Sequence, residues 1–287
     1  MSAGPGPVMR RRQLGAMLRR YRLDAGLSVR EVADYLMCHP AKISRMENAQ
    51  RNVSLSDVRD LCNLYNISDH EAREQLTRLT RESRENAWWQ QFDLSPAEEK
   101  FFGLEGAATR ISDFQVGGVP GRLQTRNYAT AITEAFVPED PVRVKSIVDL
   151  RMMRQEQTGN EADFTCILDE SVLRRVVGNA ETMRDQIRYL IDQAESQVSL
   201  QVVPFSRGAH QGMISGFTVL QFGESFTGSQ ATPVPDVVYI EGISDARYLD
   251  RPEEVRSYLD AFTRLRDMAL SVAETIDFLV SCESVYE

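Results

Sequence analysis

Residue types that build metal centres and disulfide frameworks are scarce in this sequence. Its 287 residues include four cysteines and three histidines. The cysteines, Cys38, Cys62, Cys166 and Cys282, form no CxxC pair and no regular spacing, which argues against a zinc ribbon and against a disulfide-stabilised fold. We therefore expect buried free thiols, no metal ligands and no cofactor.

Long apolar runs are also missing. No segment approaches the roughly 18 apolar residues of a membrane span. The amino end, MSAGPGPVMRRRQ, carries three arginines but no apolar stretch after them that could serve as a signal peptide. We therefore predict a cytoplasmic protein that makes no membrane contact.

The sequence lacks the common enzyme motifs GxSxG, HExxH and GxxxxGKS/T. The GGVPG segment at residues 117–121 has neither the lysine nor the hydroxyl that hold phosphate and metal in a P-loop, so we expect a tight turn there. We predict no catalytic residue and no enzymatic activity.

What is present is a globular composition, 42% hydrophobic and 26% charged, in a chain long enough for two domains. The net charge of −9 is unevenly distributed. Residues 8–53 hold ten Lys and Arg against four Asp and Glu, a net of +6, and residues 54–287 hold 23 against 38, a net of −15. A small basic head on a large acidic body indicates that only the head meets nucleic-acid phosphates.

Hydrophobic stripes and capping residues predict five short helices in the head. The first ends at Gly26, the second begins with a capping box of Ser28 and Glu31, the third begins at Pro40, and Ser54 with Asp57 and Ser68 with Glu71 begin the fourth and fifth. We expect the fifth helix to continue to the tryptophans at 88 and 89 and to form a helical connector.

The second and third of these helices, with a three-residue break between them, predict a helix-turn-helix whose second member lies in the major groove. Ile43 and Met46 anchor that helix to the core, and the small Ala33 allows a close crossing. Lys42 and Arg45 remain on or beside the outer face, where they can reach guanine acceptors or phosphates. Pro40 suits a first helical turn.

Three arginines, Arg10, Arg11 and Arg12, precede the first apolar stripe. They fit either a groove-reading arm or a disordered basic tail, and the Gly and Pro residues before them favour the tail. For the chain as a whole we predict three segments, namely a disordered tail at 1–9, a helix-turn-helix domain at 10–86 and an α+β regulatory and dimerisation domain at 87–287.

The body mixes helical and strand periods, so we expect a mainly α protein whose second domain is α+β with a small sheet. Predicted helices are 98–114, 126–136, 142–157, 181–195, 252–270 and a last one from Ser271, and predicted strands are 163–169, 198–204, 216–222 and 236–242. The glycine-rich loop between the second and third of these strands contains Arg207 and His210. It is either a ligand or partner site or a plain flexible connection.

SVREVADYL and PAKISRMENAQR resemble the XRE, or Cro/C1-type, helix-turn-helix regulators, and VPGRLQT with PFSRGAHQG resembles the C-terminal domain, of unassigned function, in actinobacterial developmental regulators of the WhiJ type. The resemblance implies a structural ion pair between Arg22 and Glu47. It also implies DNA contacts at His39, Pro40, Ala41, Lys42, Arg45, Asn48, Arg51 and Asn52.

The sequence departs from the XRE pattern at three positions. His39 stands where Ser or Thr usually caps the recognition helix, Met37 where Gly often makes the turn, and Ala49 where Gly often follows the helix. Because an alanine in the left-handed conformation is costly, we expect Asn48 to adopt that conformation instead.

Two functional classes fit these observations. The first is a sequence-specific transcription regulator, such as a repressor, that binds an inverted repeat of double-stranded DNA as a homodimer and is controlled through its body by a small partner protein or ligand. The second is an antitoxin-like or adaptor protein that mainly binds a protein partner and uses DNA binding for autoregulation. WhiJ-type regulators are commonly accompanied by a small partner protein, which is compatible with both classes.

Overall fold

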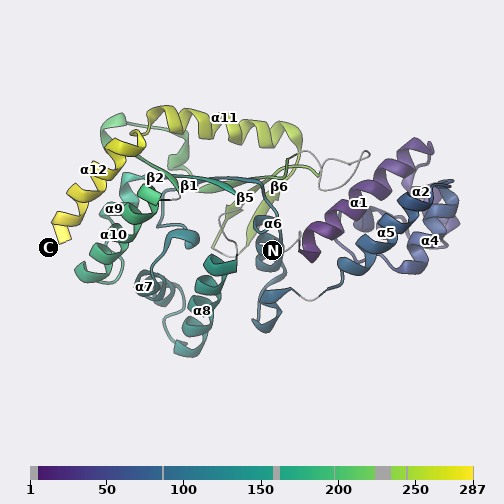
Figure 1. Ribbon diagram of the computed structural model, residues 1–287, viewed down its shortest axis with the longest axis horizontal. Coiled ribbons are helices and arrows are strands. Elements are labelled where there is room, and N and C mark those ends of the chain that lie inside the picture. Colours follow the sequence, from purple (N-terminus) through teal and green to yellow (C-terminus); the bar gives the residue numbers. More distant parts are fainter. Residues whose placement is uncertain are drawn as a thin grey trace. The chain divides into compact units, whose positions relative to one another are not determined.

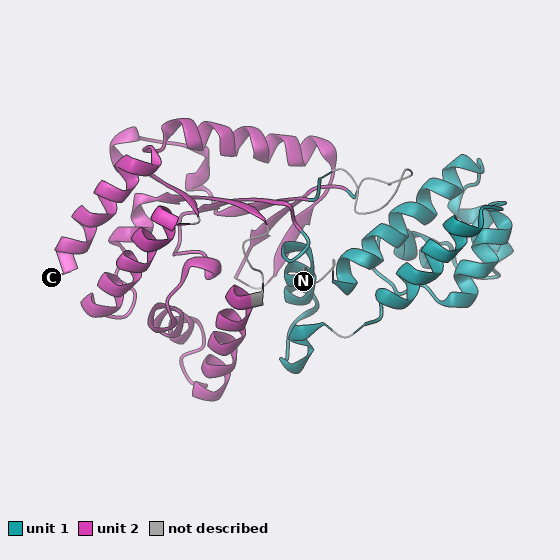
Figure 2. Cartoon of the chain, in the orientation of Figure 1, with its two compact units in different colours: residues 1–107, 222–234 teal, residues 108–221, 235–287 magenta. Residues whose placement is uncertain are grey.

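The structure is a computed structural model that describes residues 6–85, 87–157, 162–196, 198–223, 234–243 and 245–286. The chain divides into two compact units (Figure 2). Unit 1 comprises residues 1–107 and 222–234, and unit 2 comprises 108–221 and 235–287. The predicted fold class, a helical head followed by an α+β domain with a sheet, is confirmed. Unit 1 extends beyond residue 86, and the predicted domain boundary stays a prediction.

Unit 1 begins with the five expected helices (Figure 1). They are α1 Pro7–Asp24, α2 Val29–Tyr35, α3 Pro40–Glu47, α4 Leu55–Leu64 and α5 His70–Glu82. Two of the three predicted caps are present, since the side chains of Ser28 and Ser54 accept from the amides of Glu31 and Asp57. The helices share one apolar core that draws its buried residues from Leu14 to Leu79.

The first helix starts earlier than expected. Pro7, Val8 and Met9 were predicted to belong to a disordered tail, whereas they form the first turn of α1, and Met9 is fully buried. The physical reason is a later helix, α6 Pro96–Glu105. A Cβ built on Gly103 would lie 2.3 Å from Cβ of Val8, so glycine at this position lets α6 cover the start of α1.

The prediction that the fifth helix runs on to the tryptophans was wrong. It begins at an Asp69 cap rather than at Ser68, and it ends at Glu82. Ser83 donates its hydroxyl back to the carbonyl of Thr80, and the side chain of Arg84 donates to the carbonyl of Val53 at 2.9 Å, so both residues end the helix with bonds of their own. A separate 3-10 helix follows at Trp88–Gln91.

Unit 2 is built on a six-stranded mixed sheet in the order β3-β2-β1-β4-β5-β6. The strands are β1 Arg110–Gln115, β2 Asp163–Asp169, β3 Ser199–Val203, β4 Phe217–Gln221, β5 Val237–Glu241 and β6 Ala246–Leu249. β1 pairs in parallel with β2, and β2 in parallel with β3, while the pairs β1–β4, β4–β5 and β5–β6 are antiparallel. The four predicted strands are confirmed.

Helices accompany this sheet. They are α7 Arg126–Phe136, α8 Pro141–Gln157, α9 Glu170–Arg174, α10 Ala180–Ser196, α11 Pro252–Met268 and α12 Val272–Glu283. Val255, Phe262 and Leu265 of α11 pack into a core with Phe114 and Phe217 of the sheet. Figure 1 shows α11 along one face of the sheet and α7, α8 and α10 on the other side. The capping box predicted at Ser271 is present.

One predicted helix was wrong. Residues 98–114 were expected to form a single helix, whereas α6 ends at Glu105 and β1 begins at Arg110. β1 lies at the centre of the sheet with a neighbour on each edge, so its residues Ile111–Phe114 are buried and show no polar–apolar alternation. β6 was not predicted because it is a four-residue edge strand.

Of the predicted buried thiols, Cys62, Cys166 and Cys282 are buried and Cys38 is half-buried. No helix in the described ranges is long and apolar enough to cross a membrane. Within the same ranges, no group of three or more His, Cys, Asp or Glu side chains is placed to hold a metal ion.

Candidate nucleic-acid interface

The helix α3 is short and amphipathic, and its buried side is anchored at two points. Ile43 and Met46 are each only 1% exposed. The helix starts at Pro40, and the Nδ1 atom of His39 accepts a hydrogen bond from the amide of Ala41 at 3.1 Å. His39 therefore replaces the usual hydroxyl cap. Because Nδ1 accepts this bond, Nε2 is the ring nitrogen of the exposed His39 that can donate to a phosphate.

The predicted ion pair between Arg22 and Glu47 is confirmed, and it ties α1 to the end of α3. Nε and an Nη of Arg22 donate to the two carboxylate oxygens of Glu47 at 2.6 and 2.9 Å. A third bond of 2.8 Å goes to the carbonyl of Leu27. Both side chains are more than nine-tenths buried, so the fork fixes the orientation of α3.

Gly15 brings α1 close to α3 at the same end. A Cβ built on Gly15 would lie 2.5 Å from the carbonyl oxygen of Glu47 and 2.8 Å from that of Met46. A side chain of any size would push the two helices apart. Gly15 was not among the predicted site residues, although an isolated glycine inside a helical stripe is a recognised sign of close packing.

The outer face of α3 and the loop after it carry exposed polar side chains. Arg45, Asn48, Gln50, Arg51 and Asn52 are exposed, and Ala41 and Ser44 are half-buried. Within the described chain neither Arg45 nor Arg51 forms an ion pair. A free guanidinium at the outer face of such a helix can bind O6 and N7 of guanine together or a phosphate.

Lys42 lies differently from what the sequence predicts. Its Nζ atom is 2.6 Å from Oδ1 of Asp57, and its side chain is 26% exposed. Asp57 is the residue that completes the capping box of α4. Lys42 therefore links the recognition helix to α4, and its role as a base reader stays a prediction. The pairing spans 15 residues, so local sequence patterns do not reveal it.

The predicted geometry after α3 was wrong. Asn48 has a φ of −90°, whereas Ala49 adopts the left-handed region with a φ of +56°. The amide of Gln50 donates a hydrogen bond to the carbonyl of Arg45 at 2.8 Å, and the amide of Ala49 donates one to the carbonyl of Met46 at 3.2 Å. These bonds close the helix end and offset the left-handed alanine. Met37, in the turn between α2 and α3, has a φ of +47°.

The arginines at the start of α1 form neither a groove-reading arm nor a disordered tail, because all three lie in the helix. Arg10 pairs with Glu82 at 2.9 Å. Burial lowers the pKa of Arg11, and the guanidinium of Arg12 lies over the ring of Phe222 at 5.6 Å from its centre. Their positions hold α1 against the rest of unit 1.

The glycine-rich loop of unit 2 lies between β3 and β4, as predicted. Arg207 is exposed, but the side chain of His210 is 4% exposed and its Nε2 lies 3.0 Å from Oδ2 of Asp169. The ring also packs edge-on against Phe114. His210 thus fixes the loop to the end of β2. Asp169 was not predicted as its partner.

The helices α2 and α3 are joined by a tight turn at Met37, and the buried ion pair of Arg22 with Glu47 holds α3 in place. This is the arrangement of a helix-turn-helix protein. Residues 13–76 match a helix-turn-helix domain family, which indicates a DNA-binding regulator. Residues 99–281 match the family described as a domain of unknown function (DUF5753), and the chain belongs to that family. No curated protein matches the chain.

Proposed function

We propose that this protein is a sequence-specific transcription regulator of the XRE kind that binds DNA through α3 and the loop after it. The observation that carries the proposal is the division of α3 into two sides. Ile43 and Met46 are buried, and Arg45 and Arg51 stand exposed without an ion pair in the described chain. Arg45 is the candidate base reader, and Arg51, Asn52 and His39 are candidate phosphate contacts.

The proposed active form is a homodimer. A recognition helix of eight residues is too small by itself to distinguish one site from a genome of competing sites. Two copies on half-sites about one helical turn apart supply the required selectivity and read an inverted repeat. Unit 2 is the candidate for dimerisation and for control by a small partner protein or ligand, in line with the WhiJ-type resemblance.

The test is selection of bound sequences from a random duplex library by the full chain. The expected result is an inverted repeat whose half-sites are about 10 base pairs apart, together with a dimer in light scattering. Selection of no sequence, or a monomer both free and on DNA, contradicts the proposal. Binding is measured at two salt concentrations because phosphate contacts make affinity depend on salt.

A second candidate is an antitoxin-like or adaptor protein. The observation that favours it is the group of exposed apolar side chains on the glycine-rich loop, where Phe205, Met213 and Ile214 are 57%, 62% and 91% exposed. Such side chains are typical of protein-binding surfaces. A genome-wide map of bound sites separates the two candidates, since a regulator occupies many sites and an autoregulating adaptor occupies its own promoter.

A further inference from the structure

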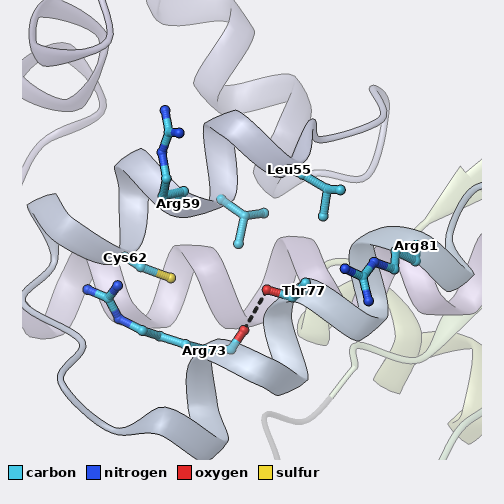
Figure 3. A pocket seen from close by; sticks show the side chains of 7 residues that line it. Leu55, Arg59, Cys62, Arg73, Thr77 and Arg81 are labelled. Atoms are coloured by element: carbon cyan, nitrogen blue, oxygen red, sulfur yellow. Dashed lines mark hydrogen bonds between the residues drawn. The ribbon is translucent and has the colours of Figure 1, made fainter.

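A groove of about 260 Å³ runs between α4 and α5 of unit 1, and none of the predicted DNA-contact residues lines it (Figure 3). Two kinds of side chain line it. Its floor is apolar or neutral, and its charged residues are all arginines. The lining residues are Leu55, Val58, Cys62 and Thr77, together with Arg59, Arg73 and Arg81.

Arginines lie at both ends of the groove, Arg59 and Arg73 near Cys62 and Arg81 near Leu55 (Figure 3). Arg73 is fixed, because its Nε donates to the carbonyl of Ile67 at 2.6 Å and an Nη donates to Asn63 at 2.9 Å. Arg81 reaches in from the end of α5 near Leu55 (Figure 3), and it forms no ion pair in the part of the chain that the structure describes. Arg59 is 70% exposed, with Nε 3.1 Å from Asp60.

The floor of the groove decides what kind of anion it fits. Leu55 is 44% exposed at the first position of α4, and Thr77 turns its hydroxyl back to the carbonyl of Arg73, which leaves its methyl group for the groove. A phosphodiester backbone gains nothing from apolar surface. The volume also lies below the roughly 300–1,000 Å³ typical of small-molecule pockets.

We propose that this groove binds an acidic segment of a partner protein. The segment inserts an apolar side chain between α4 and α5, and its carboxylates pair with the guanidinium groups of Arg59 and Arg81. Arginine is suited to this task because its planar fork holds a carboxylate at two points, and a groove between two helices is a common site for an amphipathic helix. The proposal goes beyond DNA binding and does not depend on it.

The probe is a fluorescein-labelled synthetic peptide of fifteen residues with leucines at helical spacing among glutamates. Its binding to the full chain is followed by fluorescence anisotropy. Two matched peptides, one with Gln for each Glu and one with Ala for each Leu, separate the two parts of the recognition. Each control peptide is expected to bind at least about tenfold more weakly than the probe. A probe that does not bind, or that binds no better than either control, overturns the proposal.

Variants then locate the site. Arg81→Glu reverses a charge in the groove, and Thr77→Trp fills the groove while keeping all three arginines. The matched control is Arg78→Glu, which makes the same charge change on the same helix outside the groove. We expect about tenfold loss of peptide binding for Arg81→Glu and Thr77→Trp, and less than twofold for Arg78→Glu. Circular dichroism checks that each variant is folded. If one of the two groove variants does not fold, the other is compared with Arg78→Glu.

Three results contradict the assignment. Equal losses for Arg78→Glu and Arg81→Glu mean unspecific charge attraction. A loss of duplex affinity in Arg81→Glu as large as that in Arg51→Glu means that the groove arginines contact phosphate. If the chain self-associates and the Thr77→Trp variant does not, a second copy of the chain occupies the groove. Peptide binding and duplex binding are separate measurements, so failure of this proposal is distinguishable from failure of the DNA-binding one.

Discussion

Lys42 of α3 and Asp57 of α4 are joined by an ion pair of 2.6 Å, and the same carboxylate accepts the amide of Ser54 at 3.2 Å. One side chain thus caps α4 and holds the recognition helix. Burial acts to raise the pKa of Asp57, but the hydrogen bonds from Lys42 and Ser54 outweigh it, and the pKa is lowered. The resulting stabilisation is complete above the ordinary pKa of 3.8 and is lost as pH falls through the lowered value.

The first prediction is that Lys42 and Asp57 are energetically coupled. Lys42→Ala and Asp57→Ala each lower the free energy of unfolding by about 1 kcal/mol or more, and the double variant loses less than their sum. Urea unfolding of the four proteins at pH 7 measures the coupling, which is expected to shrink when the cycle is repeated below pH 3.8. Additive losses at pH 7 contradict the pairing. Arg59→Ala, at a 70% exposed side chain, is the control and changes little.

The second prediction separates base reading from backbone contact. Arg45→Ala is expected to cost about 1–3 kcal/mol at particular base pairs and to relax specificity there. Arg51→Ala is expected to weaken binding to all duplexes alike and to reduce the dependence on salt. Binding of each variant to the selected operator and to a scrambled duplex, at two salt concentrations, provides the comparison. If both variants lose affinity uniformly, Arg45 reads no base.

The third prediction concerns the buried fork between Arg22 and Glu47. Glu47→Ala leaves a buried guanidinium without its carboxylate and is expected to lower the free energy of unfolding by about 3–5 kcal/mol. Glu85→Ala, at an exposed position just after α5, is the matched control and is expected to stay within about 0.5 kcal/mol of the wild type. Chemical unfolding followed by circular dichroism measures both. A loss as small as that of the control excludes a structural role for the pair.

The fourth prediction tests the close approach of α1 and α3. Gly15→Ala places a methyl group 2.5 Å from the carbonyl oxygen of Glu47, so α3 must shift, at a cost of about 1–3 kcal/mol. Gly117→Ala is the matched control, because a Cβ there meets nothing within 4 Å. Thermal unfolding compares the two proteins. A Gly15→Ala protein as stable as the control disproves the contact.

The fifth prediction follows from the left-handed alanine. Ala49→Gly removes the steric cost of a φ of +56° and is expected to stabilise the protein by about 0.5–1 kcal/mol. The same substitution at Ala16, inside α1, is expected to destabilise it by about 1 kcal/mol. Both variants are compared with the wild type in one chemical unfolding assay. Changes of opposite sign in the free energy of unfolding support the left-handed turn at Ala49, and changes of the same sign contradict it.

The local parts of the fold could be predicted from the sequence. The capping boxes at Ser28, Ser54 and Ser271 start helices where expected, because a cap depends on residues three positions apart. The apolar β-branched runs at 163–169 and 216–222 became strands β2 and β4 for a similar reason. The ion pair of Arg22 with Glu47 was predicted from a resemblance to a family and not from the residues alone.

The parts that failed depend on distant residues. β1 was taken for helix because its strand character comes from β2 and β4, which lie far along the chain. Lys42 looked like a free cation because Asp57 belongs to the next helix. His210 finds Asp169 only once β2 and the glycine-rich loop are brought together. Patterns within a single segment contain none of these relationships.

The central position of β1 also bears on the order in which the protein takes shape during synthesis. The apolar core of the head needs no residue beyond Leu79, whereas β1 waits for a partner on its other edge until Phe217–Gln221 has been made. At ribosomal rates of about 5–20 residues per second, the head has on the order of ten seconds to fold before the sheet can close. The residues that surround α3 are therefore all available while the chain is still attached to the ribosome, so α3 can be packed in its core before the sheet of unit 2 is complete.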